Sequence, residues 1–238
     1  MQVILLGATG RLGGMIVDIL SKKSLAFHTL NRDEVKSIDY IAKLLTVPSV
    51  FIDVSAIEGS MHLCYNLIRL PQNCKNAIKG IIIGTTGHNQ EHIAHIEQAA
   101  VLAPTCLVPN FSRGILLLNE MLSAITSHGK TVVQLAESLG FDIGIFESHH
   151  KNKLDSPSGT AISIAKNINI NIEKITSQRL GETVGEHSIL INQAAEEVRI
   201  THIAHDRKVF ALGAVDLCEK MFQSNFQPGM YAFKDFLV

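Results

Sequence analysis

The chain has 238 residues, of which 46% are hydrophobic and 18% charged, and its formal net charge is −1. This length suits one large domain or two modest ones. The balanced charge and the absence of tryptophan argue against a nucleic-acid partner. No apolar run reaches the ~20 residues that a membrane span needs. Four scattered cysteines, and an N-terminus that enters an apolar strand at once, lead us to expect a cytoplasmic protein without a signal peptide.

The first half of the chain alternates short apolar strands with amphipathic helices. Strands are predicted at residues 3–6, 27–30, 50–54, 80–83 and 105–108, and helices at 11–20, 35–45, 60–70 and 89–100. Such alternation is typical of α/β proteins, in which helices cover both faces of a parallel sheet. We therefore predict an N-terminal Rossmann-like, doubly wound parallel sheet.

From residue 115 the pattern changes to that of an α+β domain. Helices are predicted at residues 115–126, 160–168 and 210–222, and alternating strands at 131–137, 144–147, 188–193 and 197–204, followed by a short apolar tail at 233–238. This predicts a C-terminal α+β domain with an open mixed sheet. Short junctions near 110–114 and 211–214 would divide the chain into a dinucleotide-binding domain, residues 1–110 and 212–238, and a substrate-binding and oligomerisation domain, residues 111–211.

A glycine-rich turn joins the first predicted strand to the first predicted helix. It reads Gly7-Ala8-Thr9-Gly10-Arg11-Leu12-Gly13. Glycines in this position let the backbone approach a pyrophosphate, which the helix N-terminus then binds. After the second strand, Asn31 and Arg32 favour the 2′-phosphate of NADPH, but Asp33 and Glu34 follow closely, so NADH also fits this reading.

Two further loops fall at the same predicted edge of the sheet. Gly84-Thr85-Thr86-Gly87 follows the fourth strand, and Pro109-Asn110-Phe111-Ser112-Arg113-Gly114 follows the fifth. Either loop alone is more typical of a turn or a helix cap. Because ligands bind beyond the carboxyl ends of parallel strands, the pair predicts cofactor contacts from Gly84, Thr85, Thr86, Pro109, Asn110 and Phe111.

The segment from residue 147 to residue 160 carries the clearest chemistry. It reads Glu-Ser-His-His-Lys-Asn-Lys-Leu-Asp-Ser-Pro-Ser-Gly-Thr, and its last three residues open an apolar-periodic helix. A helix N-terminus offers unpaired N–H groups and a partial positive charge, and the preceding imidazoles and ammonium groups add proton donors. This predicts a site for a small carboxylate or phosphate ligand, although His149 and His150 could also be structural residues at a strand end.

A second histidine cluster has a plainer explanation. Residues 88–92 match the His-x-x-Glu-His pattern of some zinc proteases. The segment is polar and begins a helix just after a glycine loop, which favours a solvated helix face. We therefore expect no metal site.

Together these loops resemble the dihydrodipicolinate reductase family of bacterial diaminopimelate and lysine synthesis. The resemblance spans almost the whole chain: the glycine loop, residues 84–87 and 110–112, the segment 147–160, and residues 184–187 and 210–215. It implies reduction of 4-hydroxy-tetrahydrodipicolinate by NADPH or NADH, with hydride transfer to C4 of a cyclic dicarboxylate and loss of water. It also implies a homotetramer built through the sheet of the second domain, with residues 188–204 as the interface.

The resemblance implies roles within the segment 147–160. His149 would donate a proton or polarise the substrate, and Lys153 would be the general acid or the electrostatic partner of the ring nitrogen. The residues that would hold a substrate carboxylate are His150, Ser158, Gly159 and Thr160. Lys151 has no counterpart in the family pattern and is the more dispensable lysine.

The chain departs from the family pattern in two respects. Where the family often carries an arginine in a Thr-Arg-Pro-like turn after the third strand, this chain reads Ser55-Ala56-Ile57-Glu58. The links between the second and third strands and between residues 168 and 179 are also short. We expect changed cofactor affinity or preference rather than a lost reaction.

Two other functions fit part of the sequence. A short-chain dehydrogenase-like reductase would share the glycine loop, but it generally needs a Tyr-x-x-x-Lys pair, and none of Tyr40, Tyr65 and Tyr231 has a lysine four residues later. A non-catalytic NADP-binding sensor would explain the glycine loop but not the cluster of histidine and lysine before a helix.

Overall fold

The computed structural model describes residues 1–236 and divides into two units. One contains Met1–Phe111 and the segment that begins at Phe210; the other contains Ser112–Val209. The second division falls within the first turn of a helix that begins at Lys208. Leu237 and Val238, the last two residues of the predicted apolar tail, lie outside the described residues.

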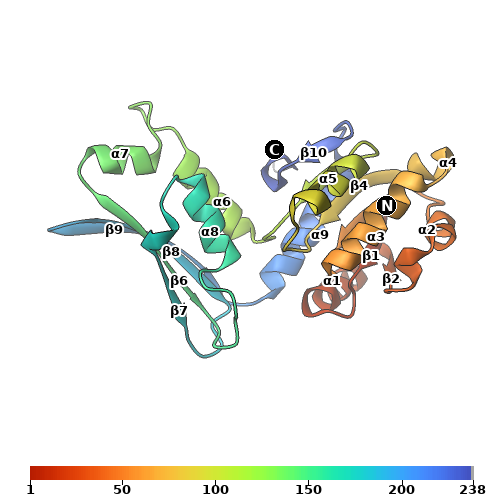
Figure 1. Cartoon of the computed structure of the whole chain (residues 1–238), viewed down its shortest axis with the longest axis horizontal. Coiled ribbons are helices and arrows are strands. Elements are labelled where there is room, and N and C mark those ends of the chain that lie inside the picture. The colour runs from red at the N-terminus through yellow and green to blue at the C-terminus, as the bar shows by residue number, and fades with distance from the viewer. Residues whose placement is uncertain (237–238) are drawn as a thin grey trace. The chain divides into compact units, whose positions relative to one another are not determined.

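The first unit is built on a six-stranded parallel sheet in the order β10-β5-β4-β3-β1-β2 (Figure 1). Its strands are β1 (Gln2–Leu6), β2 (Ala26–Leu30), β3 (Ser49–Asp53), β4 (Ile78–Ile83), β5 (Pro104–Leu107) and β10 (Gly229–Tyr231). β1 and β3 are buried along their whole length, as parallel strands covered on both faces should be. The predicted doubly wound sheet is confirmed. The short edge strand β10 was not predicted, because three residues carry too little periodicity.

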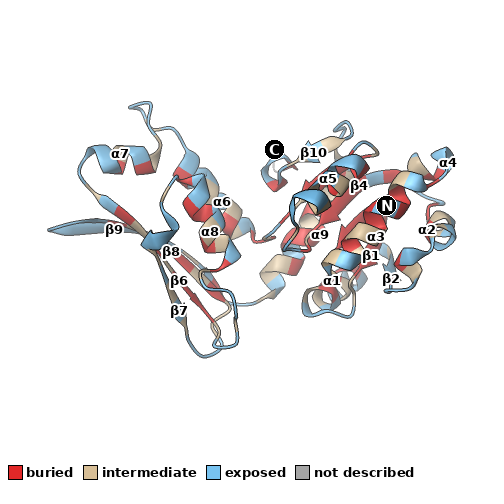
Figure 2. Ribbon diagram, in the orientation of Figure 1, coloured by how far each residue is buried: buried red, intermediate tan, exposed pale blue. Residues whose placement is uncertain are grey.

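Helices cover both faces of this sheet. The helices of the unit are α1 (Arg11–Lys22), η1 (Glu34–Lys36), α2 (Ile38–Leu44), α3 (Ile57–Arg69), α4 (Gln72–Lys75), α5 (Gln90–Ala99), α9 (Lys208–Gln223) and η3 (Phe233–Phe236). α3 and α5 lie side by side on one face, where Leu63 and Ile96 share a core with Phe51 and Ile81 (Figure 1). On α9, Met221 lies against Gly80 of β4. Figure 2 shows the buried residues concentrated in the sheet and on the helix sides that face it.

The helix predicted over residues 35–45 is wrong in one respect, because it is interrupted. Ser37 has an extended backbone, and its hydroxyl accepts a hydrogen bond from the Tyr40 amide, 3.3 Å away. Serine in this position ends one helical turn and caps the next, since its side chain replaces the missing intrahelical acceptor. The result is the short η1 turn followed by α2.

Asp53 ties together the loops at the carboxyl edge of the sheet. Its side chain is fully buried and accepts hydrogen bonds from the backbone and hydroxyl of Ser55, from the Ser60 hydroxyl and from Thr85 Oγ1, 3.1 Å away. These donors lie after β3, in α3 and after β4. One buried carboxylate therefore ties the loop after β3 to the loop after β4.

We expect Asp53→Ala to lower the free energy of unfolding by about 2–4 kcal/mol, because several buried hydroxyl and amide donors lose their acceptor. Urea unfolding measures this change. Asp33→Ala removes a carboxylate that is 93% exposed and should change stability little. Equal effects from the two variants would show that the Asp53 network does not hold the loops.

The second unit contains a four-stranded mixed sheet in the order β7-β6-β8-β9. Its elements are α6 (Arg113–Ser123), α7 (Val132–Ser138), β6 (Asp142–His149), α8 (Gly159–Asn167), η2 (Ile172–Lys174), β7 (Ile175–Arg179), β8 (Gly185–Gln193) and β9 (Glu196–Ala204). β6 runs parallel to β7 and antiparallel to β8. Ile145 and Ile189 form a core with Leu118 of α6 and Ile164 of α8. The predicted open mixed sheet is confirmed, although β7 was not predicted.

The strand predicted over residues 131–137 is wrong: this segment is the helix α7. Thr131 and Gln134 form a capping box, in which the Thr131 hydroxyl accepts from the Gln134 amide and the Gln134 side chain accepts from the Thr131 amide. A Thr-x-x-Gln spacing before an apolar run is a signal for a helix start. It outweighed the β-branched valines that suggested a strand.

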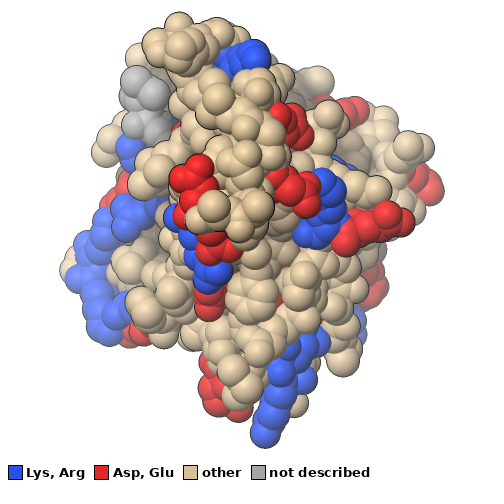
Figure 3. Space-filling model, turned by 90° about the vertical axis from the view of Figure 1, so that its left-hand side faces the viewer, with Lys and Arg blue, Asp and Glu red and all other residues tan. Residues whose placement is uncertain are grey.

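No helix within residues 1–236 is long and apolar enough to cross a membrane. On the face of the molecule shown in Figure 3, acidic and basic side chains are interspersed rather than segregated by sign.

Candidate active site

The register of the second sheet builds a polar row at the end of an apolar face. Glu147 of β6 lies opposite Ser177 of β7 and His187 of β8, and His187 lies opposite His202 of β9. Two residues back along β6, Ile145 on the same face packs into the core. Side chains of one face recur every second residue along a strand. The face of the sheet that contributes Ile145 to the core therefore carries ionisable side chains near the end of β6.

Glu147 is the centre of this cluster. Its side chain is fully buried; one carboxylate oxygen lies 2.9 Å from Arg179 Nη2, and the other is hydrogen bonded to His149 Nδ1. Burial by itself raises the pKa of Glu147, but the neighbouring Ser177 hydroxyl, the Arg179 guanidinium and the His149 ring outweigh it and hold the pKa below its usual value. A buried carboxylate with these partners stays ionised.

His149 is held by Glu147 on one ring nitrogen and bordered by Gly185 at the other. Burial lowers the pKa of His149 below its usual value, although the Glu147 carboxylate acts in the opposite direction. A Cβ atom at position 185 would come within 3.2 Å of His149 Nε2, so a glycine there leaves room for the ring. The neutral ring thus donates from Nδ1 to Glu147 and keeps a lone pair on Nε2.

His187 joins this cluster to the start of α8. Its Nε2 lies 3.3 Å from the hydroxyl of Ser158, which caps the helix by accepting from the Ala161 amide. The rings of His187 and His149 meet edge to face, 5.1 Å apart. His187 is 3% exposed, and burial, reinforced by the charge of His149, lowers its pKa to about 3.

The pKa of His187 makes stability depend on pH. The unfolded chain binds a proton at His187 near its ordinary pKa of about 6.5, whereas the folded chain resists protonation until about pH 3. Stability from the neutral ring is therefore present above about pH 6.5 and is lost at about 1.4 kcal/mol per pH unit as the pH falls. Urea unfolding at about pH 7.5 and at about pH 5 measures this loss. Between these two pH values, the free energy of unfolding should fall by about 2 kcal/mol less in His187→Gln than in the parent chain. Identical losses would contradict this assignment.

The N-terminus of α8 holds carboxylates of the chain itself. The Ser158 amide donates to Glu147 at 3.4 Å, and the Gly159 amide donates to Asp155 at 3.3 Å. Asp155 also pairs with Lys153 Nζ at 2.8 Å. Burial raises the pKa of Asp155, but the hydrogen bond and charge of Lys153 outweigh this and lower it. These contacts are what a helix N-terminus that binds anions should make.

The two lysines of the segment differ in their surroundings. The side chain of Lys153 is 24% exposed and lies close enough to His149 to lower its pKa by charge repulsion, although burial is the larger cause. Lys151 is exposed. His150 and Thr160 are half-buried, next to Lys151 and Gly159 respectively. The structure thus brings His149, Lys153 and Ser158 into one cluster.

His202 extends the cluster toward α6. Its Nε2 lies 3.1 Å from the hydroxyl of Ser112, the N-cap of α6, and its ring centre lies 6.5 Å from that of His187. Burial lowers the pKa of His202. The row therefore links the caps of α6 and α8 through two neutral histidines.

Glu147, His149 and His187 also offer one ligand atom each within 4.8 Å of one another, and among the described residues no other such set was found. Two imidazoles and a carboxylate suit zinc. Here, however, the carboxylate is already paired with the Arg179 guanidinium, so its contacts hold the ring of His149 and the start of α8 rather than a metal ion. In the other histidine cluster, His92 completes the capping box of α5 with Asn89, and its ring meets that of His88 edge to face.

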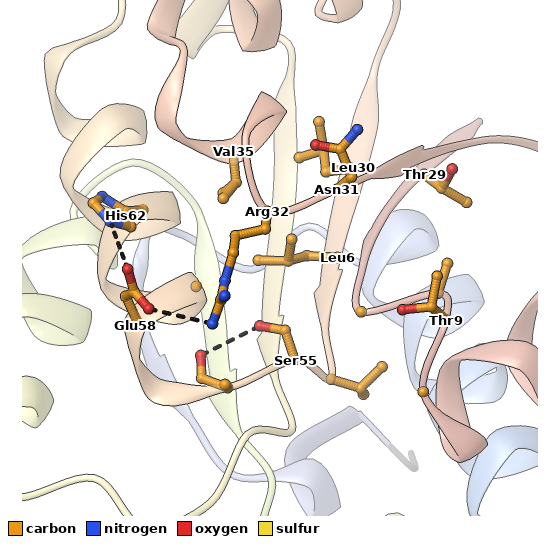
Figure 4. Close-up of a pocket in the computed structure, with 16 residues that line it drawn as sticks. Leu6, Thr9, Thr29, Leu30, Asn31, Arg32, Val35, Ser55, Glu58 and His62 are labelled. Carbon is orange, nitrogen blue, oxygen red and sulfur yellow. Dashed lines mark hydrogen bonds and ion pairs between the residues drawn. The ribbon is translucent and has the colours of Figure 1, made fainter.

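A pocket in the first unit lies along the glycine turn (Figure 4). Its lining residues include Gly7, Ala8, Thr9, Gly10, Thr29, Asn31, Arg32, Ser55, Glu58 and His62. Gly7 has φ +93°, a conformation that favours glycine, and a Cβ there would lie 2.6 Å from the Val54 carbonyl. Gly10 caps α1 without a side-chain acceptor, and the first turn carries no acidic residue. The first amides of α1 are thus suited to an anion such as a pyrophosphate.

Some residues predicted to bind the cofactor do not line this pocket. These are Arg11, Leu12, Gly13, Gly84, Thr85, Thr86, Pro109, Asn110 and Phe111. Gly13 packs beneath the turn, since a Cβ there would lie 2.0 Å from the Gly7 carbonyl. Thr85 donates to Asp53, and Phe111 is buried against Gly84 and Gly213. Gly13, Thr85 and Phe111 therefore have structural roles within the unit. Contact between a cofactor and any of the nine residues stays a prediction.

Comparison with known proteins decides the family. The model of the dihydrodipicolinate reductase N-terminus matches residues 1–111, and that of the C-terminus matches residues 114–237. The chain belongs to the dihydrodipicolinate reductase family. The resemblance stated from the sequence is therefore confirmed.

Relatives in the dihydrodipicolinate reductase family match over nearly their whole length. The 4-hydroxy-tetrahydrodipicolinate reductase of Thermosipho africanus is 32% identical, over 100% of this chain and 98% of that protein. The enzyme of the same name from Buchnera aphidicola subsp. Cinara cedri is 29% identical, over 99% and 96%. The solved structure of dipicolinate-bound dihydrodipicolinate reductase from Paenisporosarcina sp. TG-14 superposes with a TM-score of 0.68 at 18% identity, over 100% and 99%; this likeness shows a shared fold.

Proposed function

We propose that this member of the dihydrodipicolinate reductase family reduces 4-hydroxy-tetrahydrodipicolinate to tetrahydrodipicolinate in the synthesis of diaminopimelate and lysine. The observation that carries the proposal is the N-terminus of α8, where amides of Ser158 and Gly159 already hold carboxylates beside Lys153 and His149. A dicarboxylate substrate offers the same chemical group. The relatives named above carry this activity in their names.

The reaction balances without a further reactant. The hydroxyl group and a proton from the substrate ring leave together as water, and one hydride and one proton are added to the ring. A reduced nicotinamide supplies the hydride when bound, and the glycine turn with the first amides of α1 would hold its pyrophosphate. NADPH and NADH both fit this site.

Lys153 supplies the proton in this proposal, and His149 does not. The buried His149 ring is neutral, because burial lowers its pKa and Glu147 holds its Nδ1 proton. The Lys153 ammonium carries a transferable proton and also attracts a substrate carboxylate. His149 then orients the substrate through Nε2, while Ser158, Gly159, Thr160 and His150 hold a carboxylate.

The test is oxidation of NADPH or NADH, followed by absorbance, with substrate made freshly by dihydrodipicolinate synthase. We expect oxidation that depends on both substrate and protein. Binding of the reduced cofactor without substrate-dependent oxidation would instead favour a non-catalytic sensor. If neither NADPH nor NADH bound, both the reductase and the sensor function would be contradicted.

We also propose that the chain forms a homotetramer through the second sheet. On the side of β8 and β9 that faces away from the core, Ile203 is 47% exposed and Leu190 is half-buried. Exposed apolar side chains on a sheet face favour a partner surface. Light scattering should give about four times the 26.0 kDa of the chain; a monomer would contradict the proposal.

A further inference from the structure

Arg32, the residue best placed to bind a 2′-phosphate, forms an ion pair with a carboxylate that lines the same pocket. Arg32 follows β2, and Glu58 lies in the first turn of α3. Nη2 of Arg32 is 3.6 Å from one carboxylate oxygen of Glu58, and His62 Nε2 is 3.7 Å from the other. Figure 4 shows Glu58 between the two, with the Arg32 side chain directed toward it.

This contact opposes recognition of NADPH. A guanidinium binds a carboxylate or a phosphate with the same donors, so Glu58 competes for the group that a 2′-phosphate needs. The pair is exposed, 78% at Arg32 and 59% at Glu58, and such pairs are weak. A phosphate can therefore displace Glu58 from Arg32, but it would then carry its double negative charge close to the Glu58 carboxylate.

The loop after β2 adds negative rather than positive charge. The Asn31 amide donates to the Glu34 carboxylate at 2.8 Å, and the Asn31 side chain accepts from the amides of Asp33 and Glu34. Lys36 is 3.8 Å from Asp33. Arg32 thus has Glu58 as its carboxylate partner in the pocket, which suits the neutral diol of NADH, whose hydroxyls can donate to a carboxylate.

We propose that Glu58 is a specificity-determining residue that weakens NADPH binding, and leaves NADH binding intact, by pairing with Arg32. The inference rests on the proposed function, since it assumes that the pocket takes a reduced nicotinamide dinucleotide. It also gives a role to the turn, residues 55–58, in which the family often carries an arginine. Glu58 brings the affinities for the two cofactors close together.

The test is direct titration of each reduced cofactor, followed by nicotinamide fluorescence, so that it does not depend on turnover. Glu58→Gln should lower the Kd for NADPH by about 10-fold and change the Kd for NADH by less than about twofold. In the Arg32→Ala background the same substitution should lose most of its selectivity, because the competition for the guanidinium is gone. Asp33→Asn is the matched control: it removes an equal charge from an exposed carboxylate that lies outside the pocket lining.

Two outcomes would overturn the inference. Glu58→Gln could leave the ratio of the two Kd values unchanged, or Asp33→Asn could shift it equally, which would show a general charge effect. In both cases substrate-dependent oxidation by the parent chain would leave the proposed function intact. If the parent chain bound neither cofactor, the proposed function and this inference would fail together.

Discussion

Replacing Lys153 with alanine should lower turnover by about 10²–10⁴-fold, the usual contribution of a positioned acid. The affinity for the reduced cofactor should stay unchanged, because Lys153 belongs to the cluster at the start of α8 and the glycine turn lies in the other unit. Steady-state kinetics with both cofactors and a fluorescence titration of the free protein measure the two effects separately.

Lys151→Ala is the matched control for this variant. Lys151 has the same charge and lies two residues away, but it is exposed. It should retain most of the turnover. Near-normal turnover in Lys153→Ala, or an equal loss in Lys151→Ala, would contradict the assignment of Lys153 as the acid.

Glu147→Gln should have the largest effect on stability. The substitution leaves the Arg179 guanidinium without its anionic partner inside the sheet, and breaking a buried pair costs about 3–5 kcal/mol. It should also lower the pKa of His149 further, because the carboxylate that favours its charged form is gone. Urea unfolding measures the first effect, and NMR titration of the histidine ring the second.

Glu186→Gln is the control for the second substitution. Glu186 lies opposite Ser148 on the neighbouring strand, one residue out of register with the buried row, and accepts a hydrogen bond from Ser188. Its loss should cost little. If Glu147→Gln were as stable as Glu186→Gln, or left the pKa of His149 unchanged, Glu147 would not be the centre of the cluster.

The sequence predicted the fold where one periodicity dominated. The apolar runs of β1, β3 and β4 and the intervening helices indicated a parallel sheet, and the structure confirms it. Prediction failed where a single local interaction outweighed the periodicity. The capping box of Thr131 turned an apparent strand into α7, and the cap at Ser37 divided a helix.

Only those site residues that are close together in the sequence were predicted to lie together. His149, Lys153 and Ser158 lie within one short segment, so their proximity follows from the sequence. Arg179 and His187 reach the cluster through strand register, which the sequence does not specify before the sheet is known. The missed strand β7 carries Arg179, so the partner of Glu147 was missed with it.

The contact between Glu58 and Arg32 shows the same limit. Arginine after the second strand indicated a phosphate site, and the lack of arginine in the turn after the third strand indicated a departure from the family. Only the packing of α3 against η1, the turn that follows β2, shows that the two side chains meet.

The most direct test of the proposed activity is hydride transfer itself. Reduced cofactor with deuterium at the transferable position of nicotinamide C4 is incubated with the protein and freshly made substrate, and the product is examined by mass spectrometry and NMR. The proposed reductase activity predicts a single deuterium at C4 of the product ring, formed in step with cofactor oxidation. Cofactor oxidation that leaves the product without deuterium, or no substrate-dependent oxidation at all, would contradict it.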